Sequence, residues 1–163
     1  MTGISGKEIG FISKLELKNK YYFSRSDIKE NFSGDSELNV YLYRLKKKGR
    51  VVKLSKDRYF LVPIKAIKNK WVEHPFIVID EMMGSKDYCI IGKAAANYWK
   101  ITDQIPFEYE VYAVNKKPKI VKIFNFRVNI KRRRKENMPR QVVRKIYGHK
   151  FNVTTKKESE KWS

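Results

Sequence analysis

The sequence is poor in cysteine and histidine: Cys89 is the only cysteine, and His74 and His149 are the only histidines among 163 residues. A single cysteine excludes an intramolecular disulfide, and three Cys and His side chains cannot supply the four ligands of a structural zinc site. No apolar run approaches the roughly 18 residues of a membrane-spanning helix, and no secretory segment opens the chain. These absences predict a cytoplasmic protein with no metal, no cofactor and no membrane contact.

Acidic residues are also scarce. Only 17 Asp and Glu face 37 Lys and Arg, which gives a formal net charge of +20. Residues 1–63 carry 14 basic and 7 acidic side chains, residues 64–115 carry 6 and 7, and residues 116–163 carry 17 and 3. The positive charge is therefore concentrated at both ends of the chain. Such a field attracts polyanions, so nucleic acid is the expected partner, and a solubilising surface without a specific partner is the alternative.

Residues 1–63 are predicted to form three helices followed by a hairpin. The third helix has the clearest pattern, because Leu38, Leu42 and Leu45 lie at i, i+4 and i+7 and Gly49 ends it. Two β-rich runs around a short polar turn predict the hairpin. The expected helices span residues 6–17, 24–32 and 36–48, and the expected strands span 51–54 and 58–62.

Three helices and a hairpin in this order are typical of a winged helix-turn-helix, whose third helix enters the major groove while the hairpin touches the DNA backbone. If the leucine stripe faces the core, the opposite face of that helix can read bases. Asn39 can pair bidentately with adenine and Arg44 with guanine. A solvated face or a protein-interaction module is the alternative. The expected base contacts are Ser36, Asn39, Val40, Tyr43, Arg44 and Lys47, and the expected phosphate contacts are Lys46, Lys48, Lys56 and Arg58.

Residues 64–153 are predicted to form a small α+β domain, which makes the whole chain α+β. Pro75 suits the first turn of a helix that Gly84 ends, with His74 at its start. Cys89 lies in a short apolar run and is expected to be buried. The expected elements are a helix over 75–83, a strand over 88–91, a helix over 92–99, and two β-rich segments over 108–114 and 119–130.

A basic tail is predicted to follow the last of these strands. Residues 141–147 are expected to form two helical turns, and residues 154–163 are expected to be disordered. A flexible tail that makes no specific contact is the alternative. The side chains expected to contact phosphates in this tail are Lys131, Arg132, Arg133 and Arg134.

Three stretches carry a resemblance to a known family. They are LYRLKKKGRVVKLSKDRYFLVP (42–63), HPFIVIDEMMG with YCIIGKAAANYWKITDQIPFEYEVYAV (74–84 and 88–114), and KIYGHKFNV (145–153). Together they resemble the AbiEi-type antitoxins of type IV toxin–antitoxin systems and related prokaryotic transcriptional regulators. The resemblance covers about residues 20–153, and family members continue into a further region beyond the point equivalent to Ser163.

The resemblance implies an autorepressor that binds double-stranded DNA in the operator of its own operon. It also implies a functional pairing with a nucleotidyltransferase-like toxin, without a stable complex between the two proteins. On this interpretation, residues 1–63 are the DNA-binding domain, residues 64–153 are the antitoxin-type domain, and residues 154–163 are a tail.

The sequence carries no recognisable catalytic motif. It lacks a phosphate-cradling glycine loop, a metalloprotease histidine pair and a cysteine–histidine nucleophile spacing. Its middle region has only dispersed acids, which are Asp80, Glu81, Asp87 and Asp103. We therefore expect a protein without enzymatic activity. An RNA-binding accessory protein that uses the basic tail and exposed aromatic side chains is the second interpretation, and a nuclease-related protein is the third.

Overall fold

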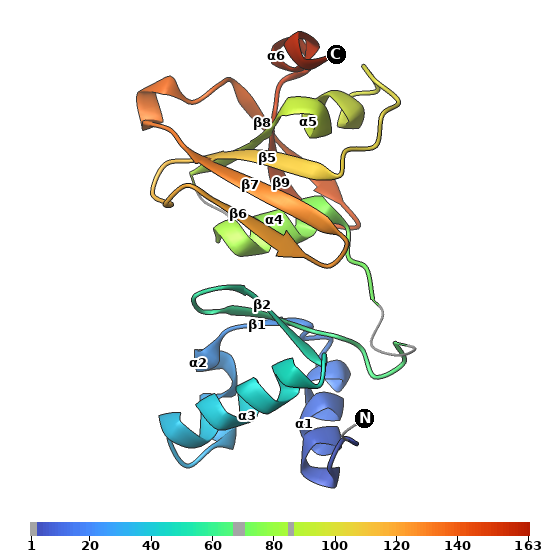
Figure 1. The fold of residues 1–163 in the computed structure, drawn as a ribbon, viewed down its shortest axis with the longest axis vertical. Coiled ribbons are helices and arrows are strands. Elements are labelled where there is room, and N and C mark those ends of the chain that lie inside the picture. Colours follow the sequence, from blue (N-terminus) through green and yellow to red (C-terminus); the bar gives the residue numbers. More distant parts are fainter. Residues whose placement is uncertain (1–2, 67–70, 85–86) are drawn as a thin grey trace. The chain divides into compact units, whose positions relative to one another are not determined.

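The computed structural model describes residues 3–66, 71–84 and 87–163, and the chain divides into two compact units, Met1–Trp71 and Val72–Ser163 (Figure 1). Both units combine helices with a β-sheet, so the fold class is mixed α+β. None of the helices in the described part of the chain is long and apolar enough to cross a membrane.

The first unit contains three α-helices and a three-stranded antiparallel sheet of order β1-β3-β2. Its expected helices and hairpin are present, while the two-residue strand β1 was not predicted. The second helix is shorter than expected, because it gives way to a 3₁₀ turn over Lys29–Asn31. The elements are α1 (Gly6–Leu17), β1 (Tyr22–Phe23), α2 (Arg25–Ile28), α3 (Asp35–Lys47), β2 (Val51–Ser55) and β3 (Arg58–Leu61).

Two capping boxes start helices of this unit. Before α1, the Ser5 side chain accepts from the Glu8 backbone N–H, and the Glu8 carboxylate accepts from the Ser5 backbone N–H at 2.7 Å. Before α2, Ser24 and Asp27 exchange the same pair of hydrogen bonds. Each box satisfies two N–H groups that a helix start leaves without partners.

The core of the first unit forms where α3 lays its leucine stripe against α1 and the sheet. Leu38, Leu42 and Leu45 are buried, as the spacing predicted, and they belong to one cluster with Ile12 of α1 and Phe23 of β1. Burying a leucine side chain contributes roughly 1.5–3 kcal/mol. The stripe therefore fixes which face of α3 is left for solvent.

The second unit is built on a six-stranded mixed sheet of order β6-β7-β5-β4-β9-β8, in which β4 pairs with β9 and β5 with β7 in parallel. Helix α4 packs against β9, and α5 packs against β4 and β5. The elements are α4 (Pro75–Met83), β4 (Tyr88–Ile91), α5 (Gly92–Tyr98), β5 (Glu108–Ala113), β6 (Lys119–Ile123), β7 (Phe126–Arg132), β8 (Gln141–Ile146), β9 (His149–Thr154) and α6 (Lys156–Ser159).

Several local predictions for this unit are confirmed. His74 caps α4, with its Nδ1 accepting from the Phe76 backbone N–H at 3.2 Å, and Gly84 ends the helix with a left-handed backbone. Cys89 is buried, and burial raises the pKa of its thiol to about 12, so the thiol stays protonated.

Two predictions for the C-terminal part need correction. Residues 119–130 are β structure as predicted, but they form not one segment but the hairpin β6–β7, which turns at Phe124 with φ +51°. Residues 141–147 do not form helical turns: 141–146 are strand β8, which pairs with β9 around a turn whose residues Tyr147 and Gly148 both have positive φ. Two such residues are what a tight hairpin turn requires. Pairing with the adjacent strand β9, not helix propensity, decides this segment.

The chain end is ordered rather than disordered. Thr155 caps α6 by accepting from the Glu158 backbone N–H, and the buried hydroxyls of Thr154 and Ser159 lie 2.9 Å apart. The basic residues expected in a tail are likewise part of the fold, since Lys131 and Arg132 are the last two residues of β7. Sheet pairing and helix capping order residues 154–163, although their composition is typical of a disordered segment.

Candidate nucleic-acid interface

The exposed face of α3 carries all six residues expected to contact bases. Tyr43 is 65% exposed and Val40 is 49% exposed, and both lie opposite the buried leucine stripe. The face combines amide, hydroxyl, guanidinium, ammonium and apolar groups, which are the groups that read base edges. Its members are Ser36, Asn39, Val40, Tyr43, Arg44 and Lys47, each of them exposed.

Arg25 connects this face to the β2–β3 turn. Its guanidinium Nη1 donates to the Asn39 side-chain oxygen at 2.6 Å, and its backbone N–H donates to the Asp57 carboxylate at 3.2 Å. Arginine is only a donor, so the oxygen of the Asn39 amide must be the engaged atom. The bidentate pairing with adenine expected for Asn39 needs that oxygen as an acceptor, and here a charged donor already takes one of its two lone pairs. No local sequence pattern indicated Arg25, because it lies 14 residues from Asn39.

Of the two cations near the β2–β3 turn, Lys56 is exposed and Arg58 lies near a carboxylate. Lys56 is exposed at the turn. The guanidinium of Arg58 lies 4.0 Å from the Asp27 carboxylate, which also accepts from the Lys20 ammonium at 2.8 Å. The Lys20 hydrogen bond, with help from the Ser24 backbone, lowers the pKa of Asp27 to about 2. Arg58 therefore faces a permanent negative charge of its own unit.

Lys48, expected to contact phosphate, is instead held by Glu8. Its ammonium lies 2.7 Å from the Glu8 carboxylate and also donates to the Gly3 carbonyl at 3.0 Å. Burial alone would raise the pKa of Glu8, but the hydrogen bonds from Lys48 and Ser5 outweigh it and hold that pKa below its ordinary value. This ion pair joins the start of α1 to the end of α3. Lys46, two residues earlier in α3, is exposed.

The basic run at the end of β7 also divides into paired and unpaired cations. Lys131 forms an ion pair with Glu110 of β5, and its hydrogen bond with that carboxylate raises the pKa of the lysine. Arg133 donates to the Tyr112 hydroxyl at 2.9 Å and lies over the same ring at 4.4 Å. Arg132 and Arg134 are exposed and form no side-chain bond with the part of the chain that the structure describes. These two are the arginines free to meet a phosphate.

The dispersed acids do not assemble into a metal site. Within residues 3–66, 71–84 and 87–163, no group of three His, Cys, Asp or Glu side chains is placed to hold a metal ion. Asp80 is buried, accepts from the Tyr88 hydroxyl at 2.7 Å and lies 2.9 Å from His149 Nε2. This network ties α4 to the β8–β9 hairpin across 69 residues of sequence, so no local pattern could have indicated it.

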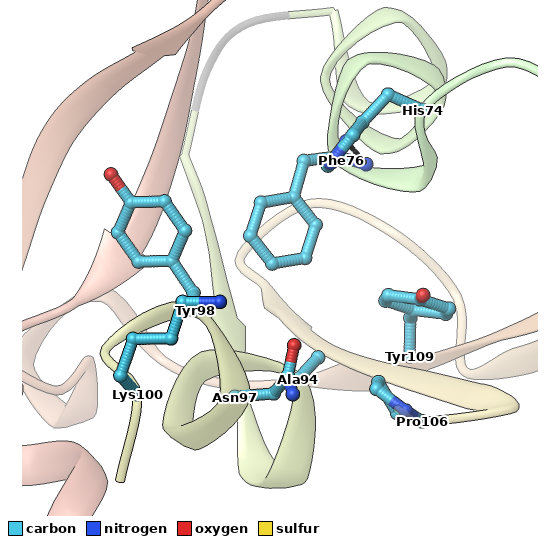
Figure 2. A pocket seen from close by; sticks show the side chains of 8 residues that line it. All are labelled: His74, Phe76, Ala94, Asn97, Tyr98, Lys100, Pro106 and Tyr109. Atoms are coloured by element: carbon cyan, nitrogen blue, oxygen red, sulfur yellow. Dashed lines mark hydrogen bonds between the residues drawn. The ribbon is translucent and has the colours of Figure 1, made fainter. Parts of the chain in front are cut away.

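The second unit also contains a pocket of about 320 Å³ between the start of α4, the helix α5 and the start of β5 (Figure 2). Aromatic side chains from all three elements surround it: Phe76, Tyr98 and Tyr109. Its polar lining comes from His74, Asn97 and Lys100. No sequence pattern predicted a cavity here.

Comparisons with known proteins assign no function to these surfaces, so their function must be argued from geometry. No protein-family model matches the chain, and no curated protein matches it either. The exposed face of α3, the free cations of each unit and the aromatic pocket are therefore the observations on which a function can be argued.

Proposed function

We propose that this protein binds double-stranded DNA in a sequence-specific way and that its first unit is a winged helix-turn-helix. Helix α3 lies in the major groove, and the β2–β3 turn contacts the adjacent backbone. The observation that carries the proposal is the division of α3 into a buried leucine stripe and an exposed face of base-reading side chains. A helix buried on one side and polar on the other fits a groove without disturbing the core.

The positions of the free cations support the same orientation. Lys46 follows the exposed face toward the end of α3, and Lys56 lies at the hairpin turn. Cations at these two places can hold phosphates on either side of a groove, which fixes the register of the helix between them. Lys48 is not part of the proposed contact set, because Glu8 already neutralises it.

We further propose that the protein is a transcriptional regulator that represses its own operon, as an antitoxin of the type IV class. This step rests on the resemblance to AbiEi-type antitoxins in residues 42–63, 74–84, 88–114 and 145–153. A regulator of this class acts beside a nucleotidyltransferase-like toxin without forming a stable complex with it. Mixing the purified proteins should therefore yield no co-eluting complex in size-exclusion chromatography.

Selection from a random duplex library, followed by fluorescence anisotropy on the enriched duplex and on a scrambled one, tests the DNA proposal. Arg44→Ala should weaken binding to the enriched duplex by about 1–3 kcal/mol and change binding to the scrambled duplex little. Lys18→Ala is the matched control, because Lys18 is an exposed cation at the end of α1. Equal losses on both duplexes in Arg44→Ala would contradict base reading by α3.

The same assay separates the alternative functions. Single-stranded RNA should compete poorly with the enriched duplex if the DNA proposal is right. Better competition by the RNA would favour the RNA-binding interpretation, in which stacked pairs such as Arg133 on Tyr112 and Arg127 on Phe107 meet bases. Cleavage of the duplex in the presence of Mg²⁺ would favour a nuclease.

A further inference from the structure

The aromatic pocket of the second unit has the size of a small-molecule site, and its lining mixes aromatic and polar side chains. Its volume of about 320 Å³ lies at the lower end of the roughly 300–1,000 Å³ of ligand pockets. The Phe76 ring lies 5.8 Å from Tyr98 and 6.0 Å from Tyr109, measured between centroids. Figure 2 shows these rings around one hollow, with Ala94 and Asn97 beside them and the Tyr98 hydroxyl pointing away from the other labelled residues.

Two polar groups of the lining have their hydrogen-bonding roles set by the protein. The Asn97 amide donates from Nδ2 to the Thr102 carbonyl at 3.2 Å, so its oxygen is left as an acceptor. The His74 Nδ1 accepts from the Phe76 backbone, so the neutral ring carries its proton on Nε2 and can donate there. Burial lowers the pKa of His74, which favours this neutral form. These two side chains thus offer the pocket one acceptor and one donor.

Lys100 supplies the only full charge among the residues that line the pocket. It follows α5 with a left-handed backbone of φ +59°, a conformation in which glycine is the usual residue. Any other residue costs about 1–2 kcal/mol there. A lysine nevertheless occupies position 100, and its ammonium is part of the pocket lining. None of the lining residues is acidic.

We propose that this pocket binds a planar heteroaromatic ring that carries an anionic group. The ring packs against the partly exposed Tyr98 and Pro106, above a floor made by the buried Phe76 and Tyr109. Its edge exchanges hydrogen bonds with Asn97 and His74, and its anion meets Lys100. Stacking on an aromatic side chain is worth about 1–3 kcal/mol for a nucleobase. A mononucleotide and a heteroaromatic carboxylate share this chemistry. The proposal is independent of DNA binding by the first unit.

Isothermal titration of the full chain at about 150 mM NaCl tests the proposal with adenosine monophosphate and indole-3-acetate as probes. At least one of them should bind saturably. Adenosine should bind more weakly than its monophosphate, and inorganic phosphate should not compete. Binding of the monophosphate alone assigns a nucleotide, binding of indole-3-acetate alone assigns a carboxylate, and binding of both supports the shared chemistry.

Lys100→Gly tests whether the pocket is the binding site. Glycine suits the left-handed backbone, so the variant should fold and should melt at or above the wild-type temperature. It should weaken binding of the anionic probe about two- to fivefold and leave adenosine binding unchanged. The matched control is Lys93→Ala, which removes an exposed lysine of the preceding helix α5 outside the pocket.

Three results would overturn the proposal. The first is that neither probe binds. The second is that inorganic phosphate displaces the probe, which would show general attraction to a chain of charge +20. The third is that Lys100→Gly and Lys93→Ala change the affinity for the anionic probe equally.

Discussion

Removing the Arg25 side chain should change which base Asn39 prefers, as well as weaken binding. The Arg25 guanidinium lies 2.6 Å from the Asn39 oxygen, a hydrogen bond strengthened by the positive charge. The bond takes one of the two lone pairs of that oxygen and restricts the directions from which the adenine amino group can reach it. Wild-type Asn39 therefore presents its Nδ2 hydrogens and should favour an acceptor that adenine lacks, such as guanine O6 or thymine O4.

The size of the change follows from the number of hydrogen bonds. A single neutral hydrogen bond contributes about 0.5–1.5 kcal/mol, so wild-type discrimination at this base should be about fivefold. In Arg25→Ala the oxygen is released and a bidentate contact with adenine becomes possible, which is worth about 1–3 kcal/mol of discrimination. Adenine should then become the preferred base at that position. Overall affinity should fall, because one cation is lost near the groove.

Library selection with wild type, Arg25→Ala and Asn39→Ala measures the preference at every position. Arg25→Lys is the control, since it keeps the charge and a donor for Asn39 and should keep the wild-type preference. A strong adenine preference in the wild type that Asn39→Ala removes would refute the reasoning about Arg25. The absence of an enriched motif from every variant would instead refute DNA reading itself.

Three further expectations concern charge and stability. Replacing Arg132 and Arg134 together with Ala should flatten the slope of log affinity against log salt by up to about 1.8, at about 0.9 per phosphate, while Arg133→Ala should change it less because Tyr112 holds that arginine. Glu8→Gln should lower the free energy of unfolding by about 1–3 kcal/mol in urea denaturation, because it removes one charge of a largely buried pair. The pKa of Asp27, lowered to about 2 by the Lys20 hydrogen bond, means that its stabilisation is present above about pH 4 and is lost as the pH falls toward 2. Melting temperatures should therefore drop over this range, and Asp27→Asn should flatten the drop.

The first unit was largely predictable because its structure follows local rules. The spacing of Leu38, Leu42 and Leu45 is set by the helix period, and the Ser24–Asp27 box is a contact between residues three apart. Both features can be recognised without knowing any distant neighbour. The exposed face of α3 follows from the buried stripe, which is why the positions of its six residues could also be deduced.

The second unit was less predictable because its sheet joins strands that are far apart in sequence. Strand β9 pairs with β4 through Val153 and Ile90. Strand β8 joins the sheet through its own pairing with β9. The sequence of β8 has short-range features that fit a helix or a strand equally. The pocket and the Asp80 network likewise depend on elements that meet only in the folded state.

Hydrogen bonding also decides which cations can serve a polyanion, and composition cannot report this. Among the eight residues expected to hold phosphates, Lys48 and Lys131 are paired with carboxylates, Arg58 faces Asp27, and Arg133 is held on Tyr112. A cation that already has an acidic partner must give up that interaction when it meets a phosphate, so its net contribution to binding is small. The free charges are Lys46 and Lys56 in the first unit and Arg132 and Arg134 in the second. Both units therefore retain positive charge for a polyanion, but with about half of the contacts that counting basic residues suggests.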